Sequence, residues 1–270
     1  MKQLSEIFYF RGNVFYRYYK ILSYLIFGKN KLAKLSLISR LKDYNNVSKT
    51  HNNRLINLHS VLEKIRNRAL LCYDDYDYGA SYNYQSFDEL CLSGFRDTAA
   101  RVNALSLKEI AAGKEIIDIG SNAGFLVFSL RNEITSAIGI EYNPYLCEQA
   151  NAVADYLGVK GKCLFENSSF ENYDSKGKKF DIVLSLANHS TYDGNTTQSL
   201  DDYFKKIQRL LHPDGIMIFE SHPPNLDTDE KVKLIMEIMD KYFEIELLKV
   251  KPLKNFLDVD RFYVCAKLKS

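Results

Sequence analysis

The segment Glu115-Ile-Ile-Asp-Ile-Gly-Ser-Asn-Ala-Gly-Phe-Leu-Val-Phe-Ser-Leu130 predicts a strand, a glycine-containing turn and the start of a helix. Its three isoleucines form the short β-branched run that is typical of a strand covered on both faces. Gly120 and Gly124 bracket the turn, where the backbone can need unusual dihedral angles or approach a ligand closely. Asp118 lies inside the apolar run, and a buried carboxylate is costly without hydrogen bonds. We therefore expect Asp118 to order the turn or to reach a cationic ligand.

A second predicted strand, Ser136-Ala-Ile-Gly-Ile-Glu141, ends in an acid. An acid at the end of the second strand of a β-α-β unit is placed to bind the two hydroxyls of a ribose. The glycine spacing is Gly-x-x-x-Gly, whereas nicotinamide dinucleotide-binding domains use G-x-G-x-x-G, so the spacing disfavours that class. A β-α-β crossover without any ligand is the other alternative.

Asp118, Gly120 and Gly124 resemble motif I of the class I S-adenosylmethionine-dependent methyltransferases, which usually reads D-x-G-x-x-x-G, and Glu141 matches the family's ribose-binding acid. The resemblance covers residues 95–268. It implies an α/β fold with a Rossmann-like seven-stranded sheet and helices on both faces, here with a helical N-terminal extension. It also implies S-adenosylmethionine as the cofactor. The residues expected to bind this cofactor are Asp118, Gly120, Ser121, Asn122, Gly124, Glu141, Tyr142, Ser168, Ser169, Phe170, Leu186 and Arg101.

The remaining core alternates between predicted strands and helices. Pro144 fits the first turn of a helix with one apolar face. A third strand is expected at 161–166, and the adenine-binding acid that the family usually places after it is replaced by Asn167 or Ser168. The further elements expected are a strand at 180–186, a helix at 200–211, a turn at 212–215, a strand at 216–220, a helix at 228–242 and strands at 243–250 and 261–268.

Composition is that of an ordinary globular chain, with 46% hydrophobic and 26% charged residues among 270. The five cysteines are scattered without a C-x-x-C pair, which fits neither zinc ligation nor a disulfide framework and indicates a reducing compartment. No apolar run approaches the roughly 18 residues of a transmembrane helix, and the N-terminus does not resemble a signal peptide. We expect a cytoplasmic location, with peripheral contact at the inner membrane face as an alternative.

Charge is distributed unevenly along the chain. Residues 1–70 hold 14 Lys or Arg against three acids, a formal charge of +11, so the remainder carries −9 within the total of +2. A basic segment of this kind favours an anionic partner. Residues 1–28 are rich in aromatic side chains. They can lie on an anionic membrane surface, stack on nucleic-acid bases, or pack on the main domain or on a second subunit in a homo-oligomer. A helix is expected at 52–70.

We predict two units, a basic, aromatic-rich helical extension at 1–70 and a methyltransferase domain at 71–270. Residues 72–105 are expected to form a lid over the substrate and the cofactor, because tyrosines and amides at such density often line a pocket. Asp97 or Thr98 can cap the helix that opens within this lid.

Two arginines in this region are candidates for binding a carboxylate. Similar bacterial methyltransferases that modify glycans or tRNA close the corresponding region over the cofactor and can bind its carboxylate there. Arg101 and Arg96 are the matching candidates here, because guanidinium binds carboxylate bidentately. Surface ion pairs are the alternative role for both.

Methylation of a sugar hydroxyl benefits from a general base, because such hydroxyls are very weak acids. His189 and His222 follow the fourth and fifth predicted strands, so both are expected at one crevice and are the predicted catalytic residues. Glu220 and Asp193 can orient them. The spacing matches no known metal signature, so no metal site is predicted, although metal binding by this pair is an alternative. The expected substrate-binding residues are Tyr84, Gln85, Arg96, Asn188 and Tyr192.

The sequence after the fourth predicted strand argues against a DNA methyltransferase. Amino-methylating DNA enzymes normally carry [DNS]-P-P-[YFW] there, whereas this chain reads Ala-Asn-His-Ser at 187–190. No cysteine follows the strands to support a covalent cytosine mechanism. The hypothesis is an O-methyltransferase that modifies a sugar or related small metabolite in bacterial surface-glycan biosynthesis. The alternatives are a tRNA methyltransferase that grips phosphates with its basic segment, and a non-catalytic binding module with the same fold.

Overall fold

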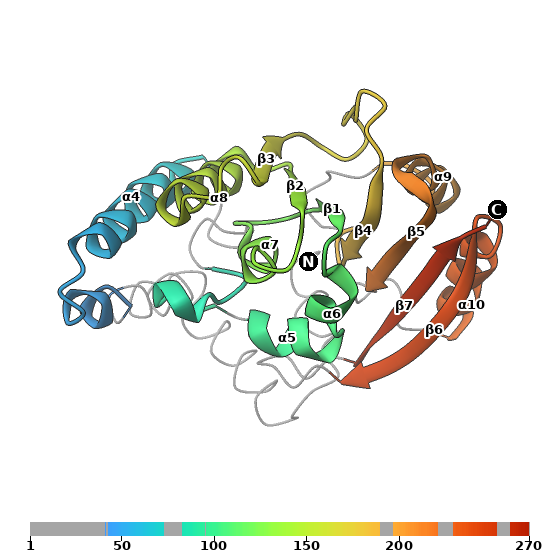
Figure 1. Cartoon of the computed structure of the whole chain (residues 1–270), viewed down its shortest axis with the longest axis horizontal. Coiled ribbons are helices and arrows are strands. Elements are labelled where there is room, and N and C mark those ends of the chain that lie inside the picture. Colours follow the sequence, from blue (N-terminus) through green and yellow to red (C-terminus); the bar gives the residue numbers. More distant parts are fainter. Residues whose placement is uncertain are drawn as a thin grey trace, which may run out of the picture.

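The computed structural model describes residues 41, 43–72, 83–94, 96–189, 197–220, 229–252 and 260–269. These residues form a mixed seven-stranded sheet in the order β3-β2-β1-β4-β5-β7-β6, with helices on both faces (Figure 1). The predicted α/β fold is confirmed. The strands are β1 (Glu115–Ile119), β2 (Ser136–Glu141), β3 (Cys163–Asn167), β4 (Phe180–Leu186), β5 (Leu211–Glu220), β6 (Phe243–Pro252) and β7 (Asp260–Leu268).

β1 lies at the centre of the parallel part of the sheet. It pairs with β2 on one side and with β4 on the other, so that Ile119 lies opposite both Ile140 and Ser185. β3 and β5 extend this parallel region outward, and β7 then joins antiparallel to β5. Because the carboxyl ends of parallel strands meet at one edge, the residues just after β1, β2 and β4 come together there.

Several helices begin at residues whose side chains accept hydrogen bonds from the backbone amides of the first turn. The side chain of Asn143 accepts from the Tyr145 amide at 2.9 Å to cap the helix that starts at Pro144. Asp97 accepts from the Ala100 amide at 2.9 Å in the same way. The helices are α4 (Asn53–Leu70), α5 (Thr98–Ala104), α6 (Leu107–Ala111), α7 (Phe125–Ser129), α8 (Pro144–Leu157), α9 (Leu200–Leu210) and α10 (Asp229–Met239), with a 3-10 turn η1 (Asp88–Leu90).

The start of β5 differs from the sequence-based expectation. A turn was predicted at 212–215 before a strand at 216–220, but the strand already begins at Leu211, which pairs with Phe180. The next pair is Ile216 with Ile182, so 212–215 bulge out of the ladder. Pairing with β4 fixes this start, and local turn composition does not reveal such pairing.

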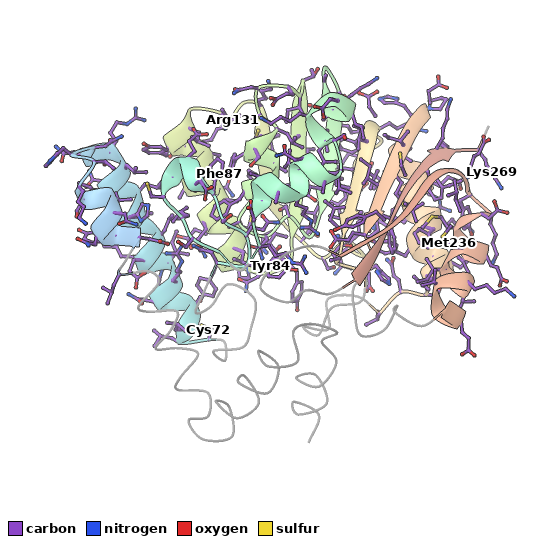
Figure 2. All side chains as sticks on the ribbon, turned by 90° about the horizontal axis from the view of Figure 1, so that it is seen from below. Cys72, Tyr84, Phe87, Arg131, Met236 and Lys269 are labelled. Atoms are coloured by element: carbon purple, nitrogen blue, oxygen red, sulfur yellow. The ribbon has the colours of Figure 1, made fainter. Side chains whose placement is uncertain are left out.

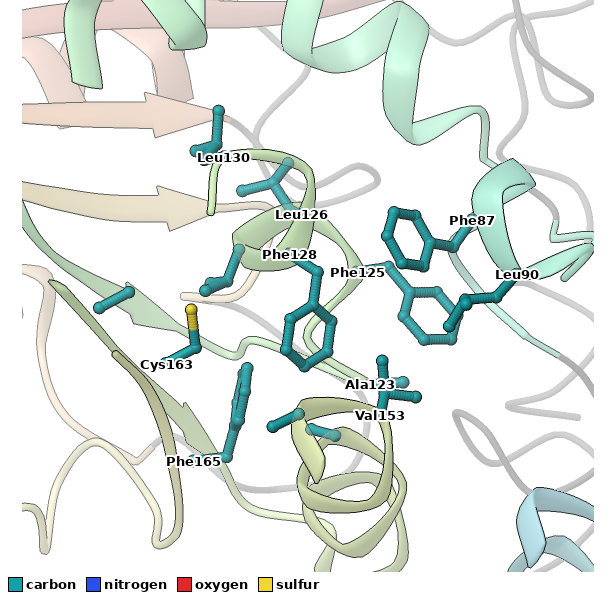
Figure 3. Packing of buried hydrophobic residues seen from close by; sticks show 14 of the residues in the cluster. Phe87, Leu90, Ala123, Phe125, Leu126, Phe128, Leu130, Val153, Cys163 and Phe165 are labelled. Carbon is teal, nitrogen blue, oxygen red and sulfur yellow. The ribbon is translucent and has the colours of Figure 1, made fainter. Parts of the chain in front are cut away.

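Alternate residues of the strands enter two hydrophobic clusters, one on each face of the sheet. Ile116 and Ile182 belong to the cluster beneath α7 and α8, whereas Ile117 and Val183 belong to the cluster beneath α9 and α10. This division follows the two-residue period of strand side chains. Figure 3 shows the first cluster, in which Phe87 and Phe165 of β3 lie against Phe125 and Phe128 of α7.

α4 is joined to the sheet through α8, beside which it lies in Figure 1. Leu55, Leu58 and Leu62 of α4 belong to the first hydrophobic cluster. The C-terminal end of α4 leads to Cys72, which is labelled in Figure 2. In this last turn Arg68 pairs with Glu148 of α8 at 2.5 Å. The predicted boundary at residue 70 stays a prediction, and residues 1–28 lie outside the described part of the chain.

Candidate active site

The turn after β1 is held tightly against β2. The amides of Gly120 and Ser121 both donate to the Ile140 carbonyl at 2.9 Å. Gly120 and Gly124 have φ angles of 70° and 76°, a region that side chains other than glycine rarely adopt. A Cβ on Gly124 would also lie 2.5 Å from the ring of Phe165. The two glycines therefore have the unusual dihedral angles that the sequence predicted, and the close approach to a ligand stays a prediction.

Glu141 connects this turn to the start of α8. Its carboxylate accepts from the Asn122 amide and from the Asn143 amide, each at 2.8 Å. The side chain is buried, with 7% of its surface exposed. Each carboxylate oxygen has more than one lone pair, so both oxygens can accept a further hydrogen bond from a ligand. Glu141 can thus order the turn and recognise hydroxyl groups at once.

Asp118 is buried at 3% exposure near the carboxyl edge of the sheet. Burial raises the pKa of its carboxyl to about 7, the positive charge of Arg101 opposes this rise, and the negative charge of Glu141 adds to it. A cation bound beside Asp118 would favour the ionised form. The carboxyl is therefore suited to a cationic ligand, as the sequence predicted.

Glu220, at the end of β5, lies between two arginines from the predicted lid. Arg101 donates to its carboxylate from Nε at 2.8 Å and also from Nη2. Burial alone would lower the pKa of Arg101, but the carboxylate of Glu220 outweighs this and raises it. Arg96 approaches the same carboxylate at 3.8 Å and lies over the ring of Tyr84. Glu220 therefore pairs with these arginines, and the role predicted for it, orienting the histidines, stays a prediction.

Asn188 and His189 follow β4 at the same edge. The side-chain Nδ2 of Asn188 donates to the Ile119 carbonyl. Its Oδ1 accepts from the Ser185 hydroxyl at 3.1 Å and from the Tyr203 hydroxyl at 2.9 Å. These bonds join the ends of β1 and β4 to α9. His189 is 7% exposed, with its ring centroid 5.1 Å from that of Phe219 and 6.0 Å from that of Tyr203.

The residues predicted to surround adenine follow β2 and β3. Asn167 donates to the Glu141 and Tyr142 carbonyls at 2.9 and 2.8 Å, and so fixes this edge. Tyr142 is 45% exposed. Ser169, Phe170 and Leu186 are all buried, and the Ser168 amide donates to the Glu141 carbonyl at 3.0 Å.

Several predicted residues take other places or lie outside the described chain. The hydroxyl of Ser121 is buried and packs close to Gly139 of β2, so its side chain points into the sheet. Gln85 is buried and bridges to Arg96 through the backbone. His222, Tyr192 and Asp193 are not among the described residues, and their roles stay predictions.

Within the described ranges, no group of three or more His, Cys, Asp or Glu side chains gathers to hold a metal ion. Of the helices within those ranges, none is long and apolar enough to cross a membrane.

Three residues of the site were missed by sequence reasoning. Asn143 orders the Glu141 carboxylate and caps α8, and the Asn-Pro pair that opens the helix could have revealed it. Tyr203 bonds to Asn188 from α9, and Tyr263 of β7 lies opposite Glu220 in the sheet. No local pattern identifies these two tyrosines, because distant strand and helix pairing brings them to the edge.

The strand order, the antiparallel β7, the glycine turn after β1 and the acid ending β2 together define a class I S-adenosylmethionine-dependent methyltransferase. A family model described as a methyltransferase domain matches residues 110–255, which is more than half of the chain. The chain belongs to this family. It is a transferase of the methyltransferase class, with S-adenosylmethionine as its cofactor.

Comparison with individual proteins supports the same class. The chain is 26% identical over 145 residues to the protein-lysine N-methyltransferase EFM4 of Saccharomyces cerevisiae, covering 50% of this chain and 61% of that protein. It thus spans about three fifths of this curated relative. A structure from Listeria monocytogenes, assigned to the S-adenosylmethionine-dependent methyltransferases, has a TM-score of 0.52 at 15% identity and covers 64% of this chain and all of its own. A SAM-dependent methyltransferase from Aquifex aeolicus has a TM-score of 0.50 at 16% identity, with coverage of 65% and 91%.

The described residues fit S-adenosylmethionine chemically. The cofactor carries a ribose diol and a positive charge. Glu141 supplies carboxylate oxygens for the diol, and Asp118 supplies a buried carboxyl whose ionised form a cation favours. Gly120 and Gly124, with positive φ angles that glycine adopts readily, place no side chain at either end of the turn.

Proposed function

We propose that the chain methylates a hydroxyl group of a sugar or related small metabolite, with His189 as the general base. The observation that carries this proposal is the position of His189. It is a buried histidine immediately after β4, at the sheet edge that also bears Asp118 and Glu141. Histidine can accept a proton near neutral pH, and a hydroxyl acceptor needs that help.

The cofactor would lie along the ends of β1, β2 and β3. Glu141 would accept from the ribose hydroxyls, and the turn between Gly120 and Gly124 would admit the cofactor close to the backbone. Asp118 would stand near its positive end, and Ser168 and Phe170 near adenine. When bound, S-adenosylmethionine supplies a methyl group already activated by its sulfonium.

The chain's own residues would then orient the acceptor and remove its proton. His189 would take the hydroxyl proton as the oxygen acquires the methyl group. Phe219 and Tyr203 pack around the imidazole. These rings keep it in a restricted orientation and exclude water, and positioning of this kind is a large part of catalysis.

A protein lysine is the second candidate acceptor, because the yeast relative is named as a protein-lysine N-methyltransferase. An amine acceptor must also lose a proton, and His189 would serve it as well. The two candidates differ in acceptor charge, since a lysine arrives as a cation.

Two measurements test the proposal in sequence. Calorimetric titration with S-adenosylhomocysteine should show binding by the wild-type protein and a loss of at least about tenfold in affinity for Glu141→Ala. Turnover on a panel of sugars, sugar nucleotides and lysine peptides, read by mass spectrometry, should then fall by about 100-fold or more in His189→Asn, which should still bind S-adenosylhomocysteine. Wild-type protein that fails to bind this ligand would favour the non-catalytic module. Full turnover by His189→Asn would remove the histidine from the mechanism.

A further inference from the structure

Among the described residues, a buried cluster at the end of β5 contains more positive than negative charge. Arg96, Arg101 and Glu220 are 4%, 2% and 0% exposed. Arg101 occupies Oε2 of Glu220 with two hydrogen bonds, whereas Arg96 reaches Oε1 only at 3.8 Å. Arg101 also faces Asp118, whose pKa of about 7 leaves it only partly ionised near neutrality. One acid and part of another therefore face two permanent cations.

The guanidinium of Arg96 has hydrogen-bonding capacity that the described residues do not use. Among them it makes no hydrogen bond, and its buried Nε lacks a partner. Its other contact is the ring of Tyr84, 5.1 Å from its centre. A guanidinium carries five N–H donors, and burying such a group without hydrogen bonds is costly. The Arg96 guanidinium is therefore placed to donate hydrogen bonds to a ligand.

A second donor lies beside it. Tyr263 pairs directly with Glu220 across β5 and β7, so the two side chains share one face of the sheet. Its hydroxyl is buried and has no hydrogen-bond partner among the described residues. The pKa of Tyr263 is raised overall, because burial and the nearby Glu220 carboxylate outweigh the opposing positive charges of Arg101 and Arg96. The hydroxyl therefore remains protonated and able to donate.

We infer that Arg96 and the Tyr263 hydroxyl bind an anionic group, a carboxylate or a phosphate, carried by the methyl acceptor. This inference rests on the proposed function and narrows its substrate class. Glu220 lies opposite Leu186, and its carbonyl accepts from the Ala187 amide at 3.0 Å, two residues before His189. An anion held there would fix the acceptor beside the proposed base. The same excess of positive charge disfavours a cationic lysine.

The cofactor's own carboxylate has the same chemistry, and the test separates the two sources. Inorganic phosphate is titrated calorimetrically into protein saturated with S-adenosylhomocysteine, at constant ionic strength. Wild-type protein should bind phosphate, Arg96→Gln should weaken it by about tenfold or more, and Tyr263→Phe by several-fold. Arg68→Gln, which removes an exposed arginine of α4, should leave phosphate binding unchanged. S-adenosylhomocysteine affinity should stay within about twofold of wild type in all three variants.

A comparison with 5′-methylthioadenosine, which lacks the amino-acid portion, identifies the source of the anion. If Arg96→Gln removes the preference for S-adenosylhomocysteine over 5′-methylthioadenosine, the anion is the cofactor's carboxylate and the inference is overturned. Phosphate binding that is absent in wild type or equal in Arg96→Gln also overturns it. Phosphate titration of the protein alone measures binding at Arg96 and Tyr263 even if S-adenosylhomocysteine does not bind. Failure of the proposed function can therefore be distinguished from failure of this inference.

A folding control accompanies the variants. Arg96→Gln leaves both hydrogen bonds between Arg101 and Glu220 in place, so its melting temperature should equal or exceed that of wild type. A marked decrease would mean that Arg96 serves the fold, which contradicts its assignment to a ligand. Tyr263→Phe removes only a hydroxyl without a described partner and gives an independent reading.

Discussion

Arg101 and Glu220 form a buried ion pair that joins α5 to the carboxyl end of β5, although 119 positions separate them in the sequence. The pair closes the side of the site opposite Glu141. Because both groups are almost fully buried, each depends on the other for compensation of its charge.

Removing one partner of this pair should therefore destabilise the fold strongly. Arg101→Met is expected to lower the free energy of unfolding by about 3–5 kcal/mol, because Glu220 loses two charge-assisted hydrogen bonds. Urea denaturation measures the loss. The double variant Arg101→Met/Glu220→Gln should recover much of it, and Arg68→Met, from an exposed pair, should cost less than about 1 kcal/mol. Additive losses in the double variant would contradict the coupling.

Asp118 should make both stability and ligand binding depend on pH. Folding raises its pKa from 3.8 to about 7. Between these two pH values the carboxyl is protonated in the folded chain and ionised in the unfolded chain. The free energy of unfolding should therefore fall as pH rises from about 4 to 7, with a limiting slope of about 1.4 kcal/mol per pH unit from this group. Asp118→Asn should remove this contribution in urea denaturation.

Binding of S-adenosylhomocysteine should show the opposite trend. Its ammonium group favours the ionised form of Asp118, so affinity should increase as pH rises through 7 and then level off. Calorimetry at several pH values measures this, and Asp118→Asn should bind more weakly with a flat profile. An unchanged slope in the variant would assign the pH dependence to another group.

The two glycines with positive φ at helix ends should respond differently to alanine. Gly124 and Gly158 have φ angles of 76° and 69°, so alanine costs about 1–2 kcal/mol at either position. At Gly124 the new Cβ would also lie 2.5 Å from Phe165, whereas nothing lies within 4 Å at Gly158. Gly124→Ala should therefore lose about 1–3 kcal/mol more in urea denaturation. Phe165→Leu should reduce that extra cost, and equal losses at both glycines would refute the steric argument.

Glu141→Gln should separate the structural from the ligand-binding role of this side chain. In wild type, the Asn122 and Asn143 amides each donate to one Glu141 oxygen at 2.8 Å. Glutamine keeps one acceptor oxygen, but its N–H₂ group would face the other amide, which then loses its hydrogen bond. Stability should fall by about 1–3 kcal/mol, and S-adenosylhomocysteine affinity by about tenfold. Thermal unfolding with and without ligand measures both. A stable variant that binds normally would show that the carboxylate charge is not used.

Much of the fold was predictable because its signals are local. Three isoleucines, two glycines and an acid at Glu141 are enough to specify the strand, the turn and the second strand. Asn143 and Pro144 mark the start of α8 in the same way. Interior packing then confirmed the alternating pattern, because strand side chains face opposite sides with a period of two.

Less of the site was predictable, since its contacts join distant segments. Asn188 was expected to bind substrate, yet its side chain bonds to Ile119, Ser185 and Tyr203. The sequence did not reveal that Glu220 pairs with Arg101 and Arg96, and its expected role in orienting the histidines stays a prediction. A side chain's type limits what it can bind, but its neighbours depend on the register of strands and the placement of helices.

The sequence by itself determined the class of protein, because the turn and the two acids predicted to bind the cofactor lie within one β-α-β unit and need only local geometry. Only the tertiary structure decided which charged side chains gather around Glu220 at the end of β5. There the carboxyl ends of β4 and β5 meet the first half of β7 and the start of α5. Burial leaves Arg96, which the sequence had already indicated, with an unused donor beside Tyr263, which no local pattern reveals.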